Sequence, residues 1–133
     1  MKHTLTSETF SLELELQIFE ADIAYSSNTI MTVTVESDGF RGCTDMDIDI
    51  KDFARFAAGA SRLYDTLGGT ARIEEPYGHQ QFLELAGDGI GHVEVCGMLH
   101  SGTQELRFEN VFDQTYLKDF AKEIERAYGK YRT

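Results

Sequence analysis

Hydrophobic and polar residues alternate strictly over several stretches in the first third of the chain. Residues 11–18 place four apolar side chains on one face and polar ones on the other, which is the pattern of a half-buried antiparallel strand. Residues 31–36 and 43–48 alternate in the same way. Asp38-Gly39 and Gly42 supply turn residues between these two stretches and favour a hairpin. We therefore expect three consecutive antiparallel strands.

The hydrophobic period then changes from two residues to three or four. Apolar side chains recur at this spacing from Phe53 to Leu67, which predicts an amphipathic helix. Asp49 is placed to cap the first turn of this helix, because its side chain can accept from a free backbone N–H. Gly68-Gly69 is placed to end it, since glycine adopts the left-handed conformation without a steric cost.

Four further strands and a second helix are expected after this point. The strands are 70–75, 80–86, 91–100 and 104–112, and a helix with Asp113 as its N-cap runs from Leu117 to Tyr131. Consecutive strands joined by tight turns favour an antiparallel meander, and the helices need a surface to cover. We expect an α+β fold of order βββαββββα in a single domain, residues 1–133. Its bent antiparallel sheet would have about seven strands, with both helices on one side or at its open end.

The charge balance narrows the class of partner. The chain has 23 acidic and 12 basic residues and a net charge of −11. Nucleic-acid recognition needs clustered Lys and Arg to neutralise phosphates, so this function is not expected. Docking on an anionic membrane surface is not expected for the same reason. A basic protein partner is compatible with the charge.

The acidic residues are concentrated on the predicted sheet and its loops. Outside the two helical segments the basic residues are only Lys2, Arg41, Arg72 and Arg107. If the helices cover the apolar face, the carboxylates project from the opposite face. One interpretation is a solvated face that keeps the protein soluble. The functional interpretation is an acidic docking surface that steers a basic partner, with the predicted partner-binding residues Glu13, Glu15, Asp45, Asp47, Glu94, Glu105 and Glu109.

Two aromatic residues lie in predicted turns and are candidate interface anchors. Phe40 is next to the Gly39–Gly42 turn, and Tyr77 lies between Pro76 and Gly78. A large apolar side chain in a turn is a good anchor when it is exposed. The alternative is that either ring folds back on the core.

Motifs for metal, nucleotide or catalytic chemistry are weak. Asp45-Met46-Asp47-Ile48-Asp49 resembles the start of a calcium loop, but the required sixth and twelfth positions are Ile50 and Phe56. Gly87, Gly89 and Gly91 lie between two strands and do not open a helix, so a hairpin turn is predicted instead of a phosphate site. His92 and Glu94 share a strand face and could act as acid and base, although an ion pair is the simpler interpretation. We expect no cofactor and no metal.

Location is expected to be cytoplasmic. The first residues contain no apolar signal-peptide region, and no stretch approaches the roughly 18 apolar residues of a membrane span. The two cysteines, Cys43 and Cys96, form no CxxC motif. Two cysteines in a chain of this size favour free thiols in a reducing compartment.

Several motifs together resemble a known family. They are Gly39-Phe40-Arg41-Gly42, Leu63-Tyr64 followed by Leu67-Gly68-Gly69, Gly91-His92-Val93-Glu94-Val95, and Asp113-Gln114-Thr115-Tyr116-Leu117. Over roughly residues 10–128 the chain resembles the WapI-type immunity proteins of bacterial polymorphic toxin systems. The resemblance implies a small cytoplasmic protein that binds and neutralises a toxin domain, often a nuclease. It carries no catalytic residues to this chain.

The leading hypothesis is therefore a non-enzymatic immunity protein that blocks a basic toxin domain through its acidic surface. The main alternative is a small-ligand-binding protein with a concavity between sheet and helices. A third hypothesis is an enzyme that uses His92 and Glu94. A fourth is an assembly role through an exposed sheet edge, and the oligomeric state is not predicted.

Overall fold

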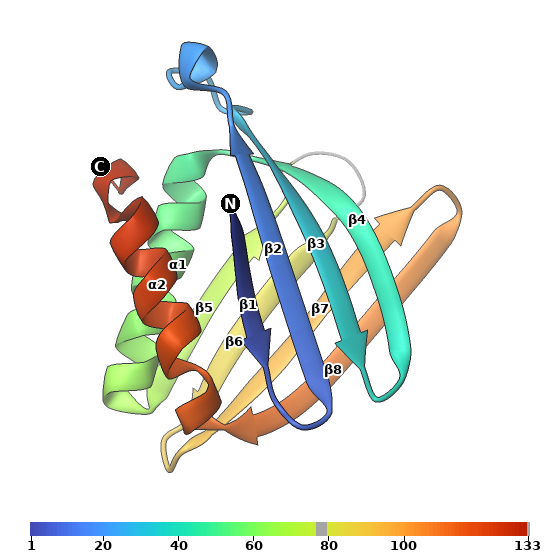
Figure 1. Ribbon diagram of the computed structural model, residues 1–133, viewed down its shortest axis with the longest axis vertical. Helices are drawn as coiled ribbons and strands as arrows, with labels where there is room; N and C mark the ends of the chain where they lie inside the picture. The colour runs from blue at the N-terminus through green and yellow to red at the C-terminus, as the bar shows by residue number, and fades with distance from the viewer. Residues whose placement is uncertain (77–79, 133) are drawn as a thin grey trace.

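The strands form two sheets, not the one bent sheet expected from the sequence. The computed structural model describes residues 1–76 and 80–132. Within it, sheet A has the order β1-β2-β3-β4 and sheet B the order β5-β6-β7-β8, with antiparallel neighbours throughout. Figure 1 shows the strands of the two sheets crossing one another. The strands of sheet A are Lys2–Thr6, Phe10–Ile18, Thr29–Ser37 and Phe40–Ile48, and those of sheet B are Gly68–Glu74, Phe82–Asp88, His92–Ser101 and Gln104–Asp113.

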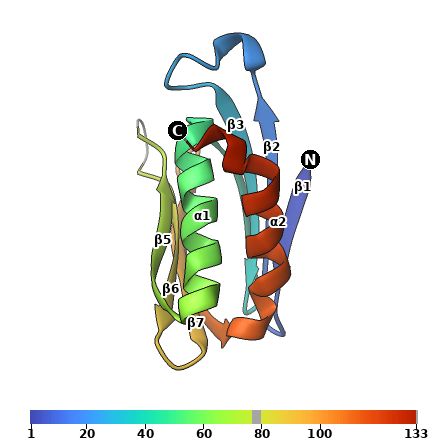
Figure 2. The same ribbon diagram turned by 90° about the vertical axis from the view of Figure 1, so that its left-hand side faces the viewer.

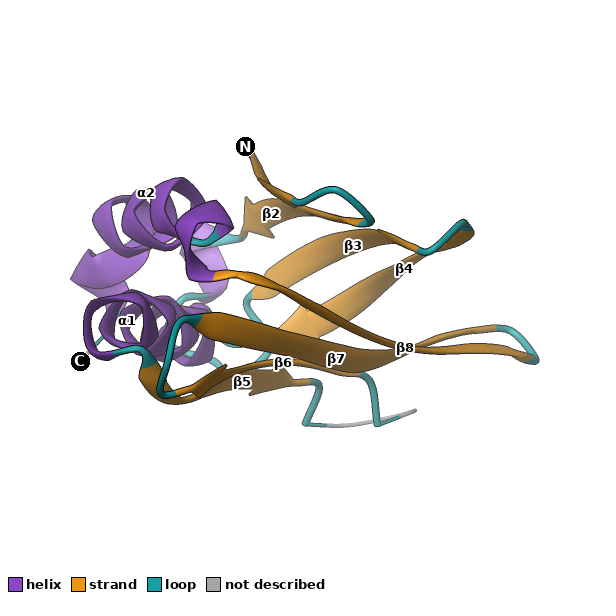
Figure 3. Ribbon diagram, turned by 90° about the horizontal axis from the view of Figure 1, so that it is seen from below, coloured by secondary structure: helices purple, strands orange, loops and turns teal. Residues whose placement is uncertain are grey.

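The helix between the sheets explains why one continuous sheet does not form. Helix α1 (Ile50–Thr66) leaves β4 and delivers the chain to β5, which pairs with β6 in the other layer. Helix α2 (Lys118–Tyr128) follows β8, so each half of the chain is a four-stranded meander followed by a helix. The two helices contact each other, α1 packs on β5 and α2 packs on β1. They lie side by side at one edge of the two layers (Figures 2 and 3).

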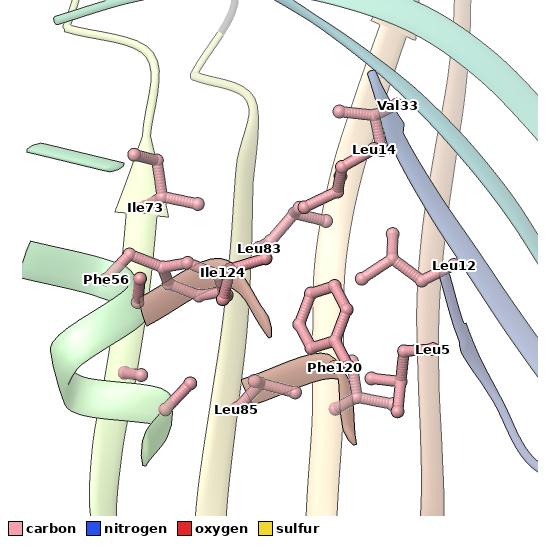
Figure 4. Close-up of a cluster of buried hydrophobic side chains, with 14 of the residues drawn as sticks. Leu5, Leu12, Leu14, Val33, Phe56, Ile73, Leu83, Leu85, Phe120 and Ile124 are labelled. Carbon is pink, nitrogen blue, oxygen red and sulfur yellow. The ribbon is translucent and has the colours of Figure 1, made fainter. Parts of the chain in front are cut away.

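The hydrophobic core fills the space enclosed by both sheets and both helices. In the middle of β2 and β3 the inward positions are apolar and inaccessible to solvent, namely Leu12, Leu14, Met31, Val33 and Val35, and the polar Thr29 and Ser37 are buried at the two ends of β3. Phe53 and Phe56 of α1 and Phe120 and Ile124 of α2 are buried with them. Figure 4 shows Phe120 and Ile124 among leucines from both sheets. The concavity proposed for a small ligand is therefore occupied by side chains.

Strand β1 was not predicted, because only Leu5 gives it an apolar inward position. His3 is the other inward residue, and both are buried. Pairing of Lys2–Thr6 with β2 and contact with α2 place this segment in the sheet. Long-range pairing of this kind leaves little trace in a local pattern of hydrophobic residues.

The predicted helix ends are correct at Asp49 and wrong at the glycines. The Asp49 side chain accepts from Lys51 N at 2.9 Å, which confirms it as the N-cap of α1. Leu67, not Gly68, takes the left-handed conformation after the helix, with a φ of 64°. The Leu67 carbonyl accepts from Gly89 N at 2.8 Å. The turn between β6 and β7 therefore helps to hold this strained residue in place.

The second predicted helix is shorter and is divided into three pieces. Asp113 caps a 3-10 turn, η2 (Gln114–Tyr116), by accepting from Thr115 N at 2.9 Å. Helix α2 then begins at Lys118, and a final turn, η3, spans Gly129–Tyr131. Another short turn, η1 (Glu20–Asp22), connects β2 to β3. Within the described residues, no helix combines the length and hydrophobicity needed to cross a membrane.

A buried glutamine joins the two sheets. Gln81 is 3% exposed, and its Oε1 accepts from His100 N of β7 at 2.9 Å. Its Nε2 donates to the Asp45 carbonyl of β4 at 3.0 Å and to Glu75 Oε1 at 3.3 Å. One side chain thus satisfies backbone groups from both layers.

Candidate functional site

The seven predicted acidic residues are divided between the outer faces of the two sheets. Outward positions of β2 and β4 carry Glu13, Glu15, Asp45 and Asp47, whereas β7 and β8 carry Glu94, Glu105 and Glu109. The core separates these faces, so the residues do not form the single surface that one sheet would have provided. Each outer face is free of the helices, which pack at the edge of the layers (Figure 3).

The outer face of sheet A is acidic but partly compensated. Lys2 lies across from Glu15 on the neighbouring strand, and its Nζ is 3.7 Å from Glu13 Oε1. Asp45 accepts from the Thr32 hydroxyl at 2.7 Å. The remaining outward positions of β3 are Ile30, Thr34 and Glu36. This face is a polar, hydrogen-bonded surface with dispersed negative charge.

The outer face of sheet B mixes ion pairs with uncompensated carboxylates. Arg72 bonds to Glu74 at 3.1 Å and Glu84 at 3.2 Å, and its guanidinium lies 4.0 Å from the centre of the Phe82 ring. Arg107 bonds to Glu105 at 3.2 Å. Each of these arginines neutralises a neighbouring carboxylate.

Glu94 and Glu109 are the exceptions on this face. Both are exposed, and neither has an ion-pair partner within residues 1–76 and 80–132. Burial and the neighbouring Glu84 carboxylate raise the pKa of the Cys96 thiol, which lies directly across from Glu109. The thiol therefore stays protonated and adds no charge of its own.

Three adjoining surface hollows surround the end of the molecule where β1 meets β2, β3 meets β4, and β8 ends. Their volumes are about 460, 540 and 290 Å³. Asp38 lines the first and second hollows, Val111 lines the second and third, and the segment Ser7–Thr9 lines the first and third. The three hollows therefore form one continuous surface, which we call the acidic end. No lysine, arginine or histidine of the described chain lines it, whereas seven carboxylates do: Glu8, Glu36, Asp38, Glu84, Glu94, Glu109 and Asp113.

Other hollows on the same molecule have mixed charge. The one between β4 and the β7–β8 hairpin is lined by Arg41 and His100 as well as Glu105. The one on α2 is lined by Lys118, Lys122 and Arg126 together with Asp119 and Glu123. The exclusively acidic lining is therefore a property of one end and does not follow simply from the net charge.

Asparagine 110 holds the acidic end in shape. Asn110 Nδ2 donates to the Ser37 hydroxyl at 3.0 Å and to the Thr9 carbonyl at 3.4 Å. The Thr9 hydroxyl donates back to Asn110 Oδ1 at 3.3 Å. These bonds tie two turns of sheet A to β8, so the carboxylates are displayed on a preorganised surface.

Exposed apolar side chains lie at and near this end. Phe40 is 72% exposed at the start of β4, which confirms the expectation of an exposed ring. Tyr77, the other predicted anchor, lies outside the described residues. Val111 and Tyr116 are 55% and 39% exposed and line the acidic end.

Sequence reasoning did not select Val111 or Asp38 as site residues. The available signal for Val111 was its outward position in a strand whose other outward residues include Glu105, Arg107 and Glu109. The Asp38-Gly39 sequence predicts a turn, but it does not tell that this turn places Asp38 next to residues of sheet B.

His92 and Glu94 do not form the acid–base pair considered from the sequence. His92 Nδ1 lies 2.9 Å from Asp88 Oδ2, and Asp88 Oδ1 accepts from Ile90 N at 2.9 Å and from His92 N at 3.0 Å. These backbone bonds, followed by the His92 side chain, lower the pKa of Asp88 to about 2. The His92 side chain therefore contacts Asp88 and helps to stabilise the β6–β7 turn. No group of three metal-ligating side chains occurs in the described part of the chain.

Comparison with known proteins identifies one family. A family model described as "Immunity protein WapI-like family" matches residues 4–132. The match spans both sheets and both helices. No curated protein matches the chain.

Proposed function

The chain belongs to the WapI-like immunity protein family, and from this membership we propose that it binds a basic toxin domain through its acidic surface. In this proposal the chain neutralises the toxin by covering it, carries out no catalysis and acts in the cytoplasm. The resemblance extends over nearly the whole chain, which supports the immunity role directly. The chemistry of the partner rests on the acidic end.

The single observation behind the partner's charge is the lining of the acidic end. Seven carboxylates and no basic residue of the described chain line it, and among them only Glu84 is ion-paired, to Arg72, so the lining creates a region of negative potential. Such a region accelerates encounter with a positively charged surface and disfavours wrong partners. The carboxylates on sheet A would contribute to this long-range steering without needing to touch the toxin.

A nuclease is the toxin class that this surface fits best. Enzymes that bind nucleic acid carry basic grooves for the phosphate backbone. A preorganised array of carboxylates can occupy such a groove in place of the phosphates. Inhibition would then be competitive with the nucleic-acid substrate.

A neutralisation assay with the toxin domain encoded beside this chain tests the proposal. We expect stoichiometric loss of toxin activity on addition of the chain. The double variant Asp45→Lys/Asp47→Lys should associate with the toxin more slowly at low salt, by roughly tenfold, because steering charges act mainly on the association rate. Asp52→Lys/Asp119→Lys, with one change on each helix, alters the net charge by the same amount and is the control for a charge change away from both sheet faces. Undiminished toxin activity at excess of the chain would contradict the immunity role.

A further inference from the structure

The outer face of β6, β7 and β8 carries a regular arrangement of charged and small apolar side chains. Ala86, Glu94 and Val111 lie directly across from one another on the three strands, and Glu84, Cys96 and Glu109 form the next outward row. Carboxylates and apolar groups therefore alternate in both directions. We call these six residues the chequered patch.

Only part of the charge in the chequered patch is compensated within the molecule. Glu84 bonds to Arg72, whereas Glu94 and Glu109 have no ion pair among the described residues. These two occupy diagonal positions on adjacent strands, which places their backbones roughly 7–8 Å apart. Asp38 reaches the same hollow from the β3–β4 turn and adds a further carboxylate.

Val111 supplies the apolar part of this surface. It is 55% exposed and lies across from Glu94 and beside Glu109 on the outer face. The outward positions of β3 on sheet A, by contrast, are Ile30, Thr32, Thr34 and Glu36, and the one apolar residue among them, Ile30, is half-buried. An exposed aliphatic group between unpaired carboxylates is therefore found on sheet B and not in the middle of sheet A.

We propose that the chequered patch receives an arginine side chain of the toxin, with the guanidinium between Glu94 and Glu109 and the aliphatic stem on Val111. A guanidinium is planar and presents donors in several directions, so it can bond to two separated carboxylates. Its methylene stem is apolar and suits contact with valine. A lysine ammonium is a compact, strongly hydrated charge and would reach only one of them well. The inference rests on the proposed function, because the toxin is the protein that brings the arginine.

A matched pair of charge-neutralising variants tests the site. Glu94→Gln/Glu109→Gln removes two charges from the patch, and Glu13→Gln/Glu15→Gln removes two from sheet A. Both lose the same net charge, so they lose comparable long-range attraction. The patch variant should weaken the equilibrium affinity for the neighbouring-gene toxin domain by about 30-fold or more, as expected for loss of a charge pair in contact. The sheet A variant should weaken it by less than about threefold, as for rim charges.

A second measurement tests the chemistry of the occupant. Each surface arginine of the toxin is replaced by lysine, and affinities are measured against wild-type chain and the Glu94→Gln/Glu109→Gln variant. One arginine should show a large loss with wild type and little further loss with the variant, because the two changes remove the same contact.

The outcomes separate the inference from the function on which it rests. Equal weakening by the two glutamine variants, or the absence of any toxin arginine whose replacement is coupled to the patch variant, would overturn the arginine site and leave the immunity role standing. Failure of the wild-type chain to bind the toxin would overturn both. Circular dichroism of each variant verifies that the exposed substitutions leave the fold intact.

Discussion

His3 Nε2 lies 2.7 Å from the hydroxyl of Tyr128, and this buried bond joins the first strand to the last helix. The two rings meet edge to face with centroids 5.2 Å apart, and His3 Nδ1 lies 3.2 Å from Glu123 Oε2. Burial, and then the nearby Glu123 and Tyr131, raise the pKa of Tyr128. The phenol therefore remains neutral as a hydrogen-bonding partner. This contact helps to hold β1 at the edge of sheet A.

Tyr128→Phe should destabilise the fold by about 1–3 kcal/mol, because it leaves a buried imidazole nitrogen without its partner. Chemical denaturation measures this change in the free energy of unfolding. Tyr131→Phe is the matched control, since the Tyr131 hydroxyl bonds to the exposed Glu20. That substitution should cost less than about 0.5 kcal/mol. An equal loss of unfolding free energy in the two variants would mean that the buried His3–Tyr128 bond stabilises the fold no more than an exposed one.

Gln81→Ala should loosen the junction between the two sheets. Its amide bonds to His100 N and to the Asp45 carbonyl in a buried position, and loss of these two buried bonds should cost about 2–4 kcal/mol. Hydrogen exchange should become faster at His100 N in particular. Gln104→Ala, at the exposed β7–β8 turn, controls for loss of a glutamine. Unchanged protection of His100 N would show that this bond does not hold the layers together.

The individual strands and helices were largely predictable, whereas their assembly into two layers was not. Alternation at Leu12–Leu16 and three-to-four spacing from Phe53 to Leu67 are local signals, and both correspond to observed elements. Neither signal tells whether β4 and β5 share a sheet. That outcome depends on where α1 delivers the chain. The local pattern did not predict β1, because its inward residue His3 is polar and bonds to Tyr128, which is 125 residues away in the sequence.

The Asp88 carboxyl should titrate with a midpoint of about pH 2 in the folded protein. Backbone donors Ile90 and His92 stabilise its charged form, so the folded pKa is below the unfolded value. The resulting stabilisation is present above about pH 4 and is lost as the pH falls toward 2. Carboxyl carbon shifts in an NMR titration measure this midpoint. His92→Ala should raise it only partly, since the two backbone bonds remain, and a wild-type midpoint near 3.8 would contradict the observed geometry.

Neutralising the unpaired carboxylates of sheet B should stabilise the free chain slightly. Like charges on neighbouring strands repel, so Glu94→Gln/Glu109→Gln should raise the free energy of unfolding by about 0.2–1 kcal/mol. Thermal unfolding at low salt detects this gain, and added salt should reduce it by screening. Stability gained where binding is lost is typical of functional surfaces. A loss of stability would instead assign these carboxylates a structural role.

The candidate site was only partly accessible from the sequence, because a face is defined by the sheet to which a strand belongs. Glu94 and Glu109 were selected for their outward phase, and the structure places both at the acidic end. Glu13 and Asp45 have the same phase but lie on the other layer. Asp38 joins the site only because a turn of sheet A reaches over sheet B, a contact between layers that local patterns do not encode.

Calorimetric titration of the chain with the toxin domain encoded beside it, at low and at high salt, tests the central claim most directly. The acidic surface predicts tight binding at low salt that weakens as salt screens the carboxylates. Tight binding that is insensitive to salt would contradict recognition through these charges. Absence of binding at both salt concentrations would contradict the proposed neutralisation of that toxin altogether.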